Sequence, residues 1–197
     1  MSGGGTGRGT HRTVRTVRAV RAAVLGALGA LLLGAITDCG GGGGGGGAAA
    51  PASPVAITVT STAFEQDGTI PDRYTCSGSG TVPALAWSGV PADAGWLALV
   101  VDDPSAPGGT FHHWYVVQIP STVKGVAEGG AAPGRAVVGW KAPCPPSGST
   151  DTYEFTVYAL PKGYAPAKLG TVPVYDADGL EAHALGEGTL SATATGK

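Results

Sequence analysis

The sequence predicts a mainly β protein, an antiparallel β-sandwich. About seven short segments have the residue pattern of strands. The chain also contains 35 glycines and 15 prolines, which divide it into short elements joined by turns. Only one segment has a helical pattern. A domain of about 140 residues buries enough surface to form a core of its own.

Apolar and turn residues alternate along the second half of the chain, as is typical of short strands joined by tight loops. Residues 97–101 (LALVV) have the continuous apolar pattern of a buried strand, and residues 153–160 (YEFTVYAL) alternate aromatic and polar side chains. The strands that we predict cover residues 55–60, 84–88, 97–101, 112–119, 136–140, 153–160 and, as an edge strand, 190–195.

The helical pattern covers residues 178–185. Asp178 and Glu181 have the spacing of a capping box, in which each side chain satisfies a backbone N–H of the first turn. Leu180 and Ala184 share one face. The pattern therefore predicts a short helix with its apolar side against the sheet.

Two segments between the strands are predicted to be irregular. Residues 121–133 are polar and glycine-rich, which indicates a surface loop. Residues 141–152 are dense in proline and glycine, and they fit neither a helix nor a strand because proline fixes φ and lacks an N–H donor.

The N-terminus has the composition of a targeting segment. Five arginines lie between residues 8 and 21, and residues 22–36 that follow are uncharged. A basic region followed by an apolar core is typical of a secretory signal peptide. The uncharged stretch is short for a membrane-spanning helix, which needs about 20 apolar residues. An uncleaved anchor helix is the alternative.

Cys39 lies where a lipoprotein signal would be processed. Bacterial lipoprotein signals resemble Leu-small-small-Cys, and Asp38 departs from that pattern in the position before the cysteine. Residues 40–47 are all glycine, as in a flexible tether. We therefore expect an exported lipoprotein on the outer face of the cell membrane, or a secreted protein. Its segments would be a lipoprotein-type signal peptide at 1–38, lipidation at Cys39, a tether at 39–54 and a folded domain at 55–197.

The charge of the exported part argues against two kinds of partner. After residue 38 the chain holds seven Lys or Arg and thirteen Asp or Glu, a net charge of −6. Nucleic-acid binding requires basic patches, and attraction to anionic lipids requires a polybasic segment. We therefore expect no nucleic-acid partner, and membrane attachment only through the N-terminal lipid.

Residues 97–120 are the leading candidate for a functional site. An apolar strand ends in Asp102 and Asp103, a Pro/Gly loop follows, and a second strand begins with His112 and His113. If the two strands are neighbours, Asp103 and His113 lie at the same end of the sheet.

Strand alternation separates the two histidines. It places His113 on one face with Tyr115, Val117 and Ile119, and His112 on the other face. A two-histidine metal site is therefore not expected.

Several motifs of this chain resemble the phosphatidylethanolamine-binding protein family, and most of all its bacterial branch, called Raf-kinase-inhibitor-like. The motifs, in the order and spacing of that family, are GTIPDRYTCSG, PALAWSGVP, DDPSAP, HHW, APCPPSG and YEFTVYAL. The resemblance covers roughly residues 57–190. It implies a two-sheet β-sandwich with one or two short peripheral helices. It also implies a shallow pocket at one end that binds phosphate and phosphoethanolamine head groups.

The resemblance assigns polar pocket residues position by position. Asp103 matches the first Asp of the family motif Asp-Pro-Asp-x-Pro, and His113 matches the pocket histidine. Ser105 stands where the second Asp is usual. Asp151 stands where a second His is usual, two residues before Tyr153.

The resemblance also suggests the pocket walls. The Pro145-Pro146 loop matches one wall, and Trp87 is a candidate for an aromatic floor. A carboxylate beside an imidazole favours its protonated form, and imidazolium is a charged donor to phosphate oxygens. On the residues by themselves, Asp103 and His113 could equally satisfy each other at a strand end.

These observations predict a non-catalytic binding protein for a small phosphate-containing or zwitterionic ligand, without cofactor or metal. Ser105, His113 and Asp103 could be imagined as a nucleophile, a base and an orienting acid, but the chain contains no G-x-S-x-G motif. A further alternative is an extracellular protease inhibitor or a regulator of another protein, with residues 121–133 as the candidate reactive loop.

Two cysteines remain after Cys39. Outside the cytoplasm, Cys76 and Cys144 can form a disulfide; two separate buried thiols are the alternative. The chain has no CxxC spacing, so we expect no structural zinc site.

Overall fold

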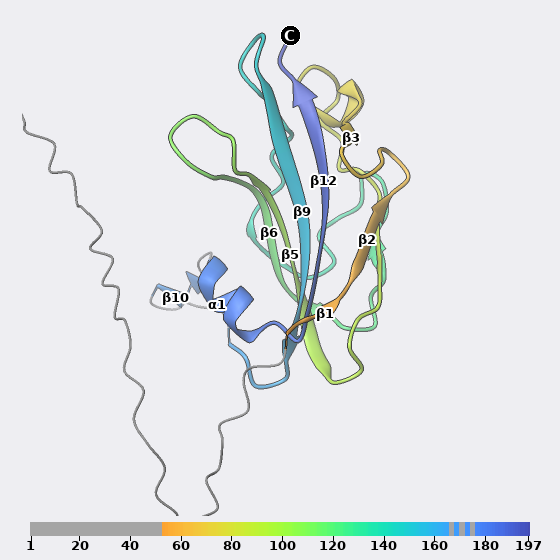
Figure 1. Cartoon of the computed structure of the whole chain (residues 1–197), viewed down its shortest axis with the longest axis vertical. Helices are drawn as coiled ribbons and strands as arrows, with labels where there is room; N and C mark the ends of the chain where they lie inside the picture. The colour runs from red at the N-terminus through yellow and green to blue at the C-terminus, as the bar shows by residue number, and fades with distance from the viewer. Residues whose placement is uncertain (1–52, 166–167, 170–171, 174–175) are drawn as a thin grey trace, which may run out of the picture. The chain divides into compact units, whose positions relative to one another are not determined.

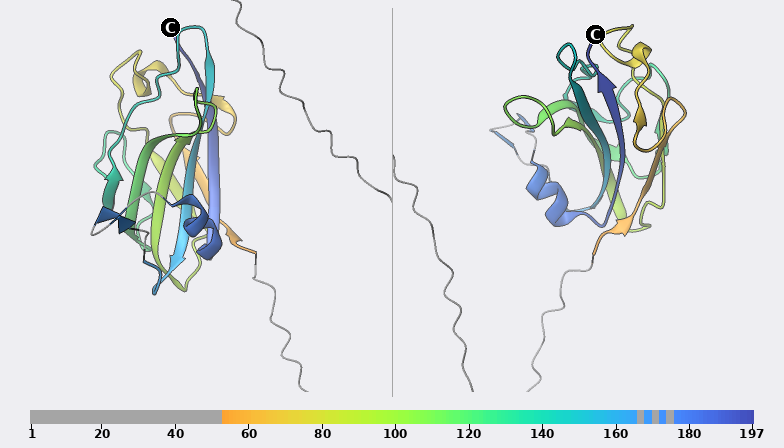
Figure 2. Two further views of the ribbon diagram at one scale, coloured as in Figure 1. Left: turned by 90° about the vertical axis from the view of Figure 1, so that its left-hand side faces the viewer. Right: turned by 45° about the horizontal axis from the view of Figure 1, so that its top comes forward.

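The computed structural model describes residues 53–165, 168–169, 172–173 and 176–197. The predicted signal peptide, Cys39 and nearly all of the tether lie outside the described residues. Two β-sheets pack face to face in the described part, with one short α-helix against the outer side of the larger sheet (Figures 1 and 2). The prediction of a mainly β two-sheet sandwich is confirmed.

The larger sheet contains the long strands. Its order is β1-β12-β9-β5-β6-β8, and β3 also pairs with β12. The bounds of these strands are Val55–Ala56 (β1), Gly68–Thr69 (β3), Ala94–Asp103 (β5), Phe111–Pro120 (β6), Arg135–Val138 (β8), Thr150–Pro161 (β9) and Gly186–Thr195 (β12).

The smaller sheet has the order β2-β4-β7, and a two-stranded hairpin β10-β11 lies apart from both sheets. The remaining elements are Thr58–Ser61 (β2), Leu85–Ser88 (β4), Gly125–Val126 (β7), Lys168–Leu169 (β10), Val172–Pro173 (β11), a 3₁₀ turn at Asp72–Tyr74 and the helix Ala177–His183 (α1).

Two strands differ from the expectation. Residues 121–133 are not a continuous loop, because β7 within them pairs with β4 and buries Val126 in the core. The last strand has ten residues, begins four residues before the predicted start at residue 190, and is not at an edge. It pairs with β9 along one side and with β1 and β3 along the other.

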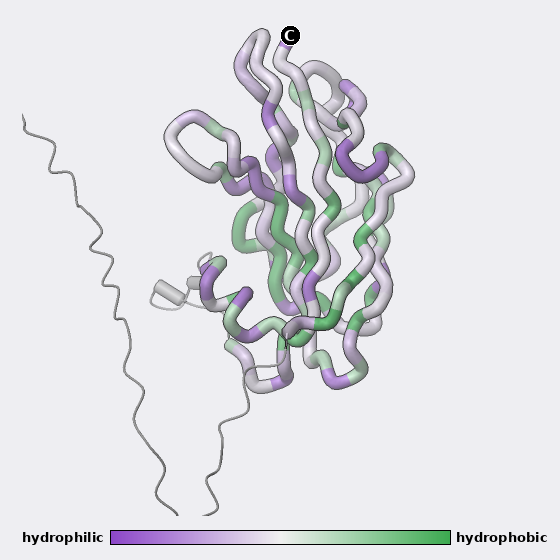
Figure 3. The backbone as a smooth tube through the Cα atoms, viewed as in Figure 1, coloured by the Kyte–Doolittle hydropathy of each residue, from purple (hydrophilic) through white to green (hydrophobic). Residues whose placement is uncertain are grey.

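The larger sheet separates two apolar clusters. The inner cluster lies between the sheets and includes Val59, Trp87, Leu99 and Phe155. The outer cluster lies on the opposite face, where Leu180 of α1 is fully buried. Figure 3 shows that β5 and β6 are apolar along their middle and hydrophilic where they run into the loop that joins them.

Two β-bulges in β6 change which side chains face the inner cluster. Leu97 and Leu99 of β5 lie opposite Ile119 and Val116, so β6 holds one extra residue between them. A second extra residue, His113, lies between the pairs that join β6 to Val101 and Asp102.

Simple alternation along β6 is therefore wrong. Tyr115 and Val117 pack in the outer cluster, whereas Ile119 packs in the inner cluster. His113 does not share a face with Tyr115, since the extra residue turns it toward the inner side. His112 and His113 still face opposite sides of the sheet, as predicted.

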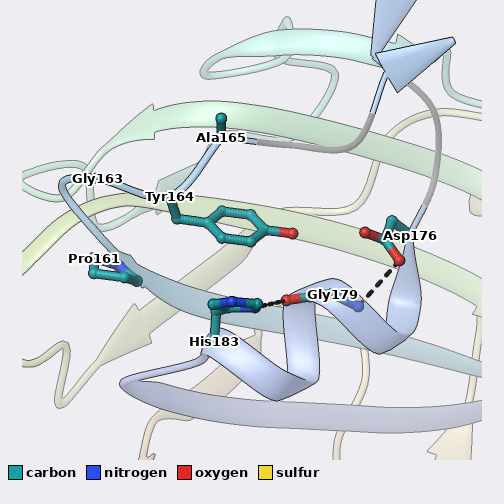
Figure 4. A pocket seen from close by; sticks show the side chains of 7 residues that line it. All are labelled: Pro161, Gly163, Tyr164, Ala165, Asp176, Gly179 and His183. Atoms are coloured by element: carbon teal, nitrogen blue, oxygen red, sulfur yellow. Dashed lines mark hydrogen bonds between the residues drawn. The ribbon is translucent and has the colours of Figure 1, made fainter.

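The N-cap of the helix lies two residues before the predicted cap, Asp178. Its N-cap is Asp176, whose side chain accepts a hydrogen bond of 3.0 Å from the Gly179 N–H (Figure 4). A Cβ at Gly179 would lie 2.1 Å from the Asp176 carboxylate, so only glycine permits this cap. Asp178, the cap expected from the capping-box spacing, instead lies in the first turn.

A disulfide joins Cys76 and Cys144, which are 68 residues apart. It lies beside two hydrogen bonds between the same segments. The Cys76 N–H donates to the Pro143 carbonyl at 2.9 Å, and the Trp140 indole N–H donates to the Gly80 carbonyl at 2.8 Å. The three interactions together hold the irregular segment after β8 against the loop that follows the 3₁₀ turn.

We predict that the purified protein contains no free thiol at Cys76 or Cys144. Closing a chain segment of this length contributes on the order of 4 kcal/mol in the chain-entropy account, so the double Cys76→Ser, Cys144→Ser variant should lose about that much unfolding free energy. Thiol titration of the denatured, non-reduced protein checks the bond, and urea unfolding checks its contribution. Two reactive thiols at these positions would refute the prediction.

Candidate functional site

A cavity of about 390 Å³ opens where β5 ends and β6 begins. Three strands that are neighbours in the larger sheet, β9, β5 and β6, bring residues distant in the sequence to this one place. The side chains that line it are Asp103, Ala106, Pro107, Phe111, His113, Lys141, Ala142, Cys144, Pro146, Asp151 and Tyr153.

Three of the predicted pocket residues meet in this cavity: Asp103, His113 and Asp151. Asp103 is the last residue of β5, and Asp151 is the second residue of β9. Each lies two residues from a residue of the inner cluster on the same strand, so both carboxyl groups point to the inner side of the sheet. Their side chains are 3% and 6% exposed, which is low for two acids in one pocket.

His113 is held by one hydrogen bond and two aromatic rings. Its Nδ1 lies 2.8 Å from the Lys141 carbonyl oxygen. A carbonyl only accepts, so Nδ1 carries a proton, and in the neutral ring the other nitrogen is an acceptor. The rings of Phe111 and Tyr153 meet the imidazole edge-on, with centroid distances of 4.8 and 5.2 Å.

The surroundings of His113 argue against the protonated form that its neighbouring carboxylate favours. Burial lowers the pKa of His113 below its ordinary value, and this effect outweighs the Lys141 carbonyl and the Asp103 carboxylate, which act in the opposite direction. The ring is therefore neutral at pH 7. It presents a hydrogen-bond acceptor and not a positive charge.

The two carboxyl groups act on each other. Burial raises the pKa of Asp151, and the neighbouring Asp103 raises it further through charge repulsion and a side-chain hydrogen bond. Burial also raises the pKa of Tyr153, with Asp103 and Asp151 adding to the shift. The interior of the cavity is therefore acidic and poorly suited to a bare anion.

Ser105 has a structural role next to the cavity. Its hydroxyl donates to the Asp103 carboxylate at 2.7 Å and accepts from the Thr152 N–H at 2.8 Å, and its own N–H donates to Asp103 at 2.9 Å. It does not line the cavity. Because its proton goes to an acid and His113 bonds to a carbonyl, these residues do not form a nucleophile–base pair.

Two of the predicted pocket residues lie elsewhere. Trp87 is 3% exposed in β4, and its indole N–H donates to the Val123 carbonyl at 2.8 Å. It belongs to the inner apolar cluster, so the prediction that it forms the pocket floor is wrong. Pro145 is buried, and its neighbour Pro146 lines the cavity.

Several lining residues were not predicted from the sequence, and three of them carry an aromatic ring or a charge: Phe111, Lys141 and Tyr153. Phe111 is 44% exposed, and the Lys141 ammonium lies 4.7 Å above its ring. Tyr153 follows Asp151 by two residues on a confidently predicted strand, so alternation was a usable signal for it. Phe111 and Lys141 had no such signal, because one begins a strand after a loop and the other lies in an irregular segment.

Another cavity, of about 510 Å³, lies between α1 and the segment after β9 (Figure 4). Its polar groups are mostly engaged within the helix. The His183 ring donates to the Gly179 carbonyl at 2.8 Å, and Asp176 caps the helix. We therefore do not regard it as the functional site. In the part of the chain that the structure describes, no group of three or more His, Cys, Asp or Glu side chains is placed to hold a metal ion.

We predict that Asp151→Asn stabilises the fold at pH 7. The raised pKa means that folding favours protonated Asp151. This contribution is complete below the unfolded value of about 3.8 and is lost as the pH rises through the folded value. Asparagine keeps the shape without the charge. Its melting temperature should exceed that of the wild type at pH 7, and the difference should shrink toward pH 4.

The exposed Asp178→Asn change removes the same charge away from the cavity and is the control. A melting temperature for Asp151→Asn at or below that of the wild type at pH 7 would show that the carboxylate pair does not strain the fold.

Comparison with known proteins gives consistent results. A family model described as phosphatidylethanolamine-binding protein matches residues 60–196. A UPF0098 protein of Methanothermobacter thermautotrophicus is 37% identical over 140 residues, covering 65% of this chain and 91% of its own. A Mycobacterium tuberculosis protein that carries the name lipoprotein LppC is 36% identical over 152 residues, covering 66% of this chain and 75% of its own.

Two crystal structures have the same fold. The phosphatidylethanolamine-binding protein homologue CT736 of Chlamydia trachomatis is 30% identical, with a TM-score of 0.60, and the similarity covers 70% of this chain and 96% of that one. E. coli YbcL, described as a new member of the mammalian family, is 28% identical with a TM-score of 0.61, and the similarity covers 72% and 99%. The family model spans well over half of the chain, so this protein belongs to the phosphatidylethanolamine-binding protein family.

Proposed function

We propose that this protein is an exported, lipid-anchored binding protein whose cavity holds a small zwitterionic or amine-bearing ligand without transforming it. The observation that carries the proposal is the pair of buried carboxyl groups, Asp103 and Asp151, in one cavity with a single lysine.

The distribution of charge in the cavity supports a ligand with an ammonium group. Asp103 and Asp151 offer negative charge, and neutral His113 offers an acceptor nitrogen. Ammonium is a donor of three hydrogen bonds and suits all three groups. Phosphate would meet repulsion from both carboxylates.

The same cavity has one place for a negative group. Lys141 lines it and is held over the exposed ring of Phe111. A zwitterion with an ammonium at one end and a phosphate at the other would match the carboxyl pair and Lys141 at the same time. Phosphoethanolamine has this chemistry.

The proposal of a non-catalytic role rests on the bonding of the polar residues. Ser105 is tied to Asp103, and His113 is tied to the Lys141 carbonyl. An activated nucleophile requires a hydroxyl or thiol bonded to a base, and the described residues of the cavity contain no such pair.

Export and lipid anchoring rest on the N-terminal sequence and on one relative. A basic region, an apolar core, Cys39 and a polyglycine stretch occur in that order, and a relative is named lipoprotein LppC. Among the described residues, no helix is long and apolar enough to cross a membrane.

We predict that ethanolamine and phosphoethanolamine bind more tightly than inorganic phosphate. Asp151→His should reverse the preference, because it replaces a carboxylate with a side chain that is never negatively charged and that becomes cationic as the pH falls. One charge-assisted hydrogen bond is worth roughly 1.5–3 kcal/mol, so phosphate affinity should rise about ten-fold or more at pH 6. Calorimetric titration of each compound checks this.

The control is Asp178→His, which introduces the same side chain at an exposed position of α1. Equal phosphate affinity in the wild type and Asp151→His would place position 151 outside the binding site. Tighter binding of phosphate than of ethanolamine by the wild type would contradict the proposed ligand class.

We predict that the membrane-bound protein begins at a lipidated Cys39. Intact-mass analysis of the protein extracted from membranes should give the mass of residues 39–197 plus the lipid. An aspartate is unusual in the position before the cysteine, so Asp38→Ala should not reduce processing. Cys39→Ala should abolish it. An unmodified Cys39 in the wild-type protein would overturn the lipoprotein assignment.

A further inference from the structure

The outer face of the larger sheet carries a second polar cavity. It has a volume of about 250 Å³ and lies between the ends of β5 and β6, the middle of β9 and the helix α1. Its polar lining includes Asp102, His112, Glu154, Tyr158 and Glu181. None of these side chains lines the cavity that contains Asp103 and His113.

Strand alternation explains how both cavities exist on one set of strands. Asp103 and Asp151 face the inner side, so Asp102 and Glu154 face the outer side. The bulge at His113 keeps His112 outward, where its Nδ1 lies 2.8 Å from the Asp102 carboxylate.

Negative charge is concentrated around this second cavity. Asp102, Glu154, Glu181 and the neighbouring Glu187 all raise the pKa of Tyr158, after the effect of its burial. Burial and then Glu181 raise the pKa of Glu187. Asp102 has His112 as a partner, but among the described residues that line the cavity there is neither lysine nor arginine.

Tyr158 adds a neutral polar group to the carboxylates of this cavity. Its side chain is 6% exposed and lines the cavity. No described residue forms a hydrogen bond with its hydroxyl, which a group bound in the cavity could therefore reach. The oxygen of a phenol can accept a hydrogen bond from an ammonium group.

We propose that this outer cavity binds a small organic cation with a primary ammonium group. The N–H groups would donate to the Tyr158 oxygen and to the carboxylates of Glu154 and Glu181. An anion would be repelled by those carboxylates. A metal ion is disfavoured because the described side chains form no ligand cluster there. The proposal does not depend on what binds at Asp103 and Asp151.

The experiment is an NMR titration of the full-length protein with 1,4-diaminobutane, observing the ring signals of His112, His113 and Tyr158. We expect saturable shifts of the His112 and Tyr158 signals. Butane-1,4-diol, which has the same length without charge, and the dianion succinate should give no saturable shift. The separate histidine signals distinguish the outer cavity from the inner one.

Variants test the two kinds of contact. Glu181→Gln and Glu154→Gln should each weaken diamine binding about ten-fold, since each removes one charge-assisted hydrogen bond. Tyr158→Phe should weaken it several-fold by removing the acceptor oxygen. Asp178→Asn, an equal change of charge on the same helix and outside the cavity lining, should leave the affinity within about two-fold.

Three results would overturn the proposal. The first is a titration in which His112 and Tyr158 do not shift or do not saturate. The second is an equal response to butane-1,4-diol. The third is a loss of affinity in Asp178→Asn as large as that in Glu181→Gln, which would mean that the diamine responds to net charge only. A shift of the His113 signal with His112 unmoved counts as the first result and would instead support an amine in the inner cavity.

Discussion

The placement of β5 between β6 and β9 is the constraint on which the rest of the site depends. Each pairing is antiparallel, so the end of β5, the start of β6 and the start of β9 reach the same edge of the molecule. Asp103, His113 and Asp151 meet there although nearly fifty residues separate the first from the last. Their carboxyl and imidazole groups are buried because the inner apolar cluster continues almost to this edge. Burial then determines their protonation: it keeps the imidazole neutral and opposes ionisation of Asp151.

Much of the fold could be predicted because it follows from local patterns. The apolar run before Asp103 and the alternation after Tyr153 correspond to β5 and β9. The bulges in β6 could not be predicted, since an extra residue leaves the composition of a strand unchanged and is detected only through its partner strand. The helix cap was displaced for a similar reason, because Asp176 and Asp178 are equally good caps until the position of Gly179 decides between them.

The site residues that could be predicted are those that occupy positions of the family motifs. Asp103, His113 and Asp151 came from motif positions, and their meeting required the sheet order. Trp87 was misplaced because a tryptophan in a strand suits a pocket floor and a sandwich core equally well, and only the three-dimensional packing distinguishes them. The lowered pKa of His113 could not be predicted, because a neighbouring carboxylate can be identified from the sequence whereas the loss of solvation cannot.

The two bulges fix the number of residues in β6, whereas the loop that joins β5 to β6 can change in length. Deleting one residue of β6 between the two bulges would exchange inner and outer side chains on one side of the deletion. The loop that joins β5 to β6 has open space around it, since a Cβ at Gly108 or Gly109 would contact nothing within 4 Å, although the positive φ of both residues favours glycine there. That loop also contributes Ala106 and Pro107 to the mouth of the cavity. Evolution can therefore lengthen the entrance and alter which ligands pass it, while the polar groups at the base keep their positions.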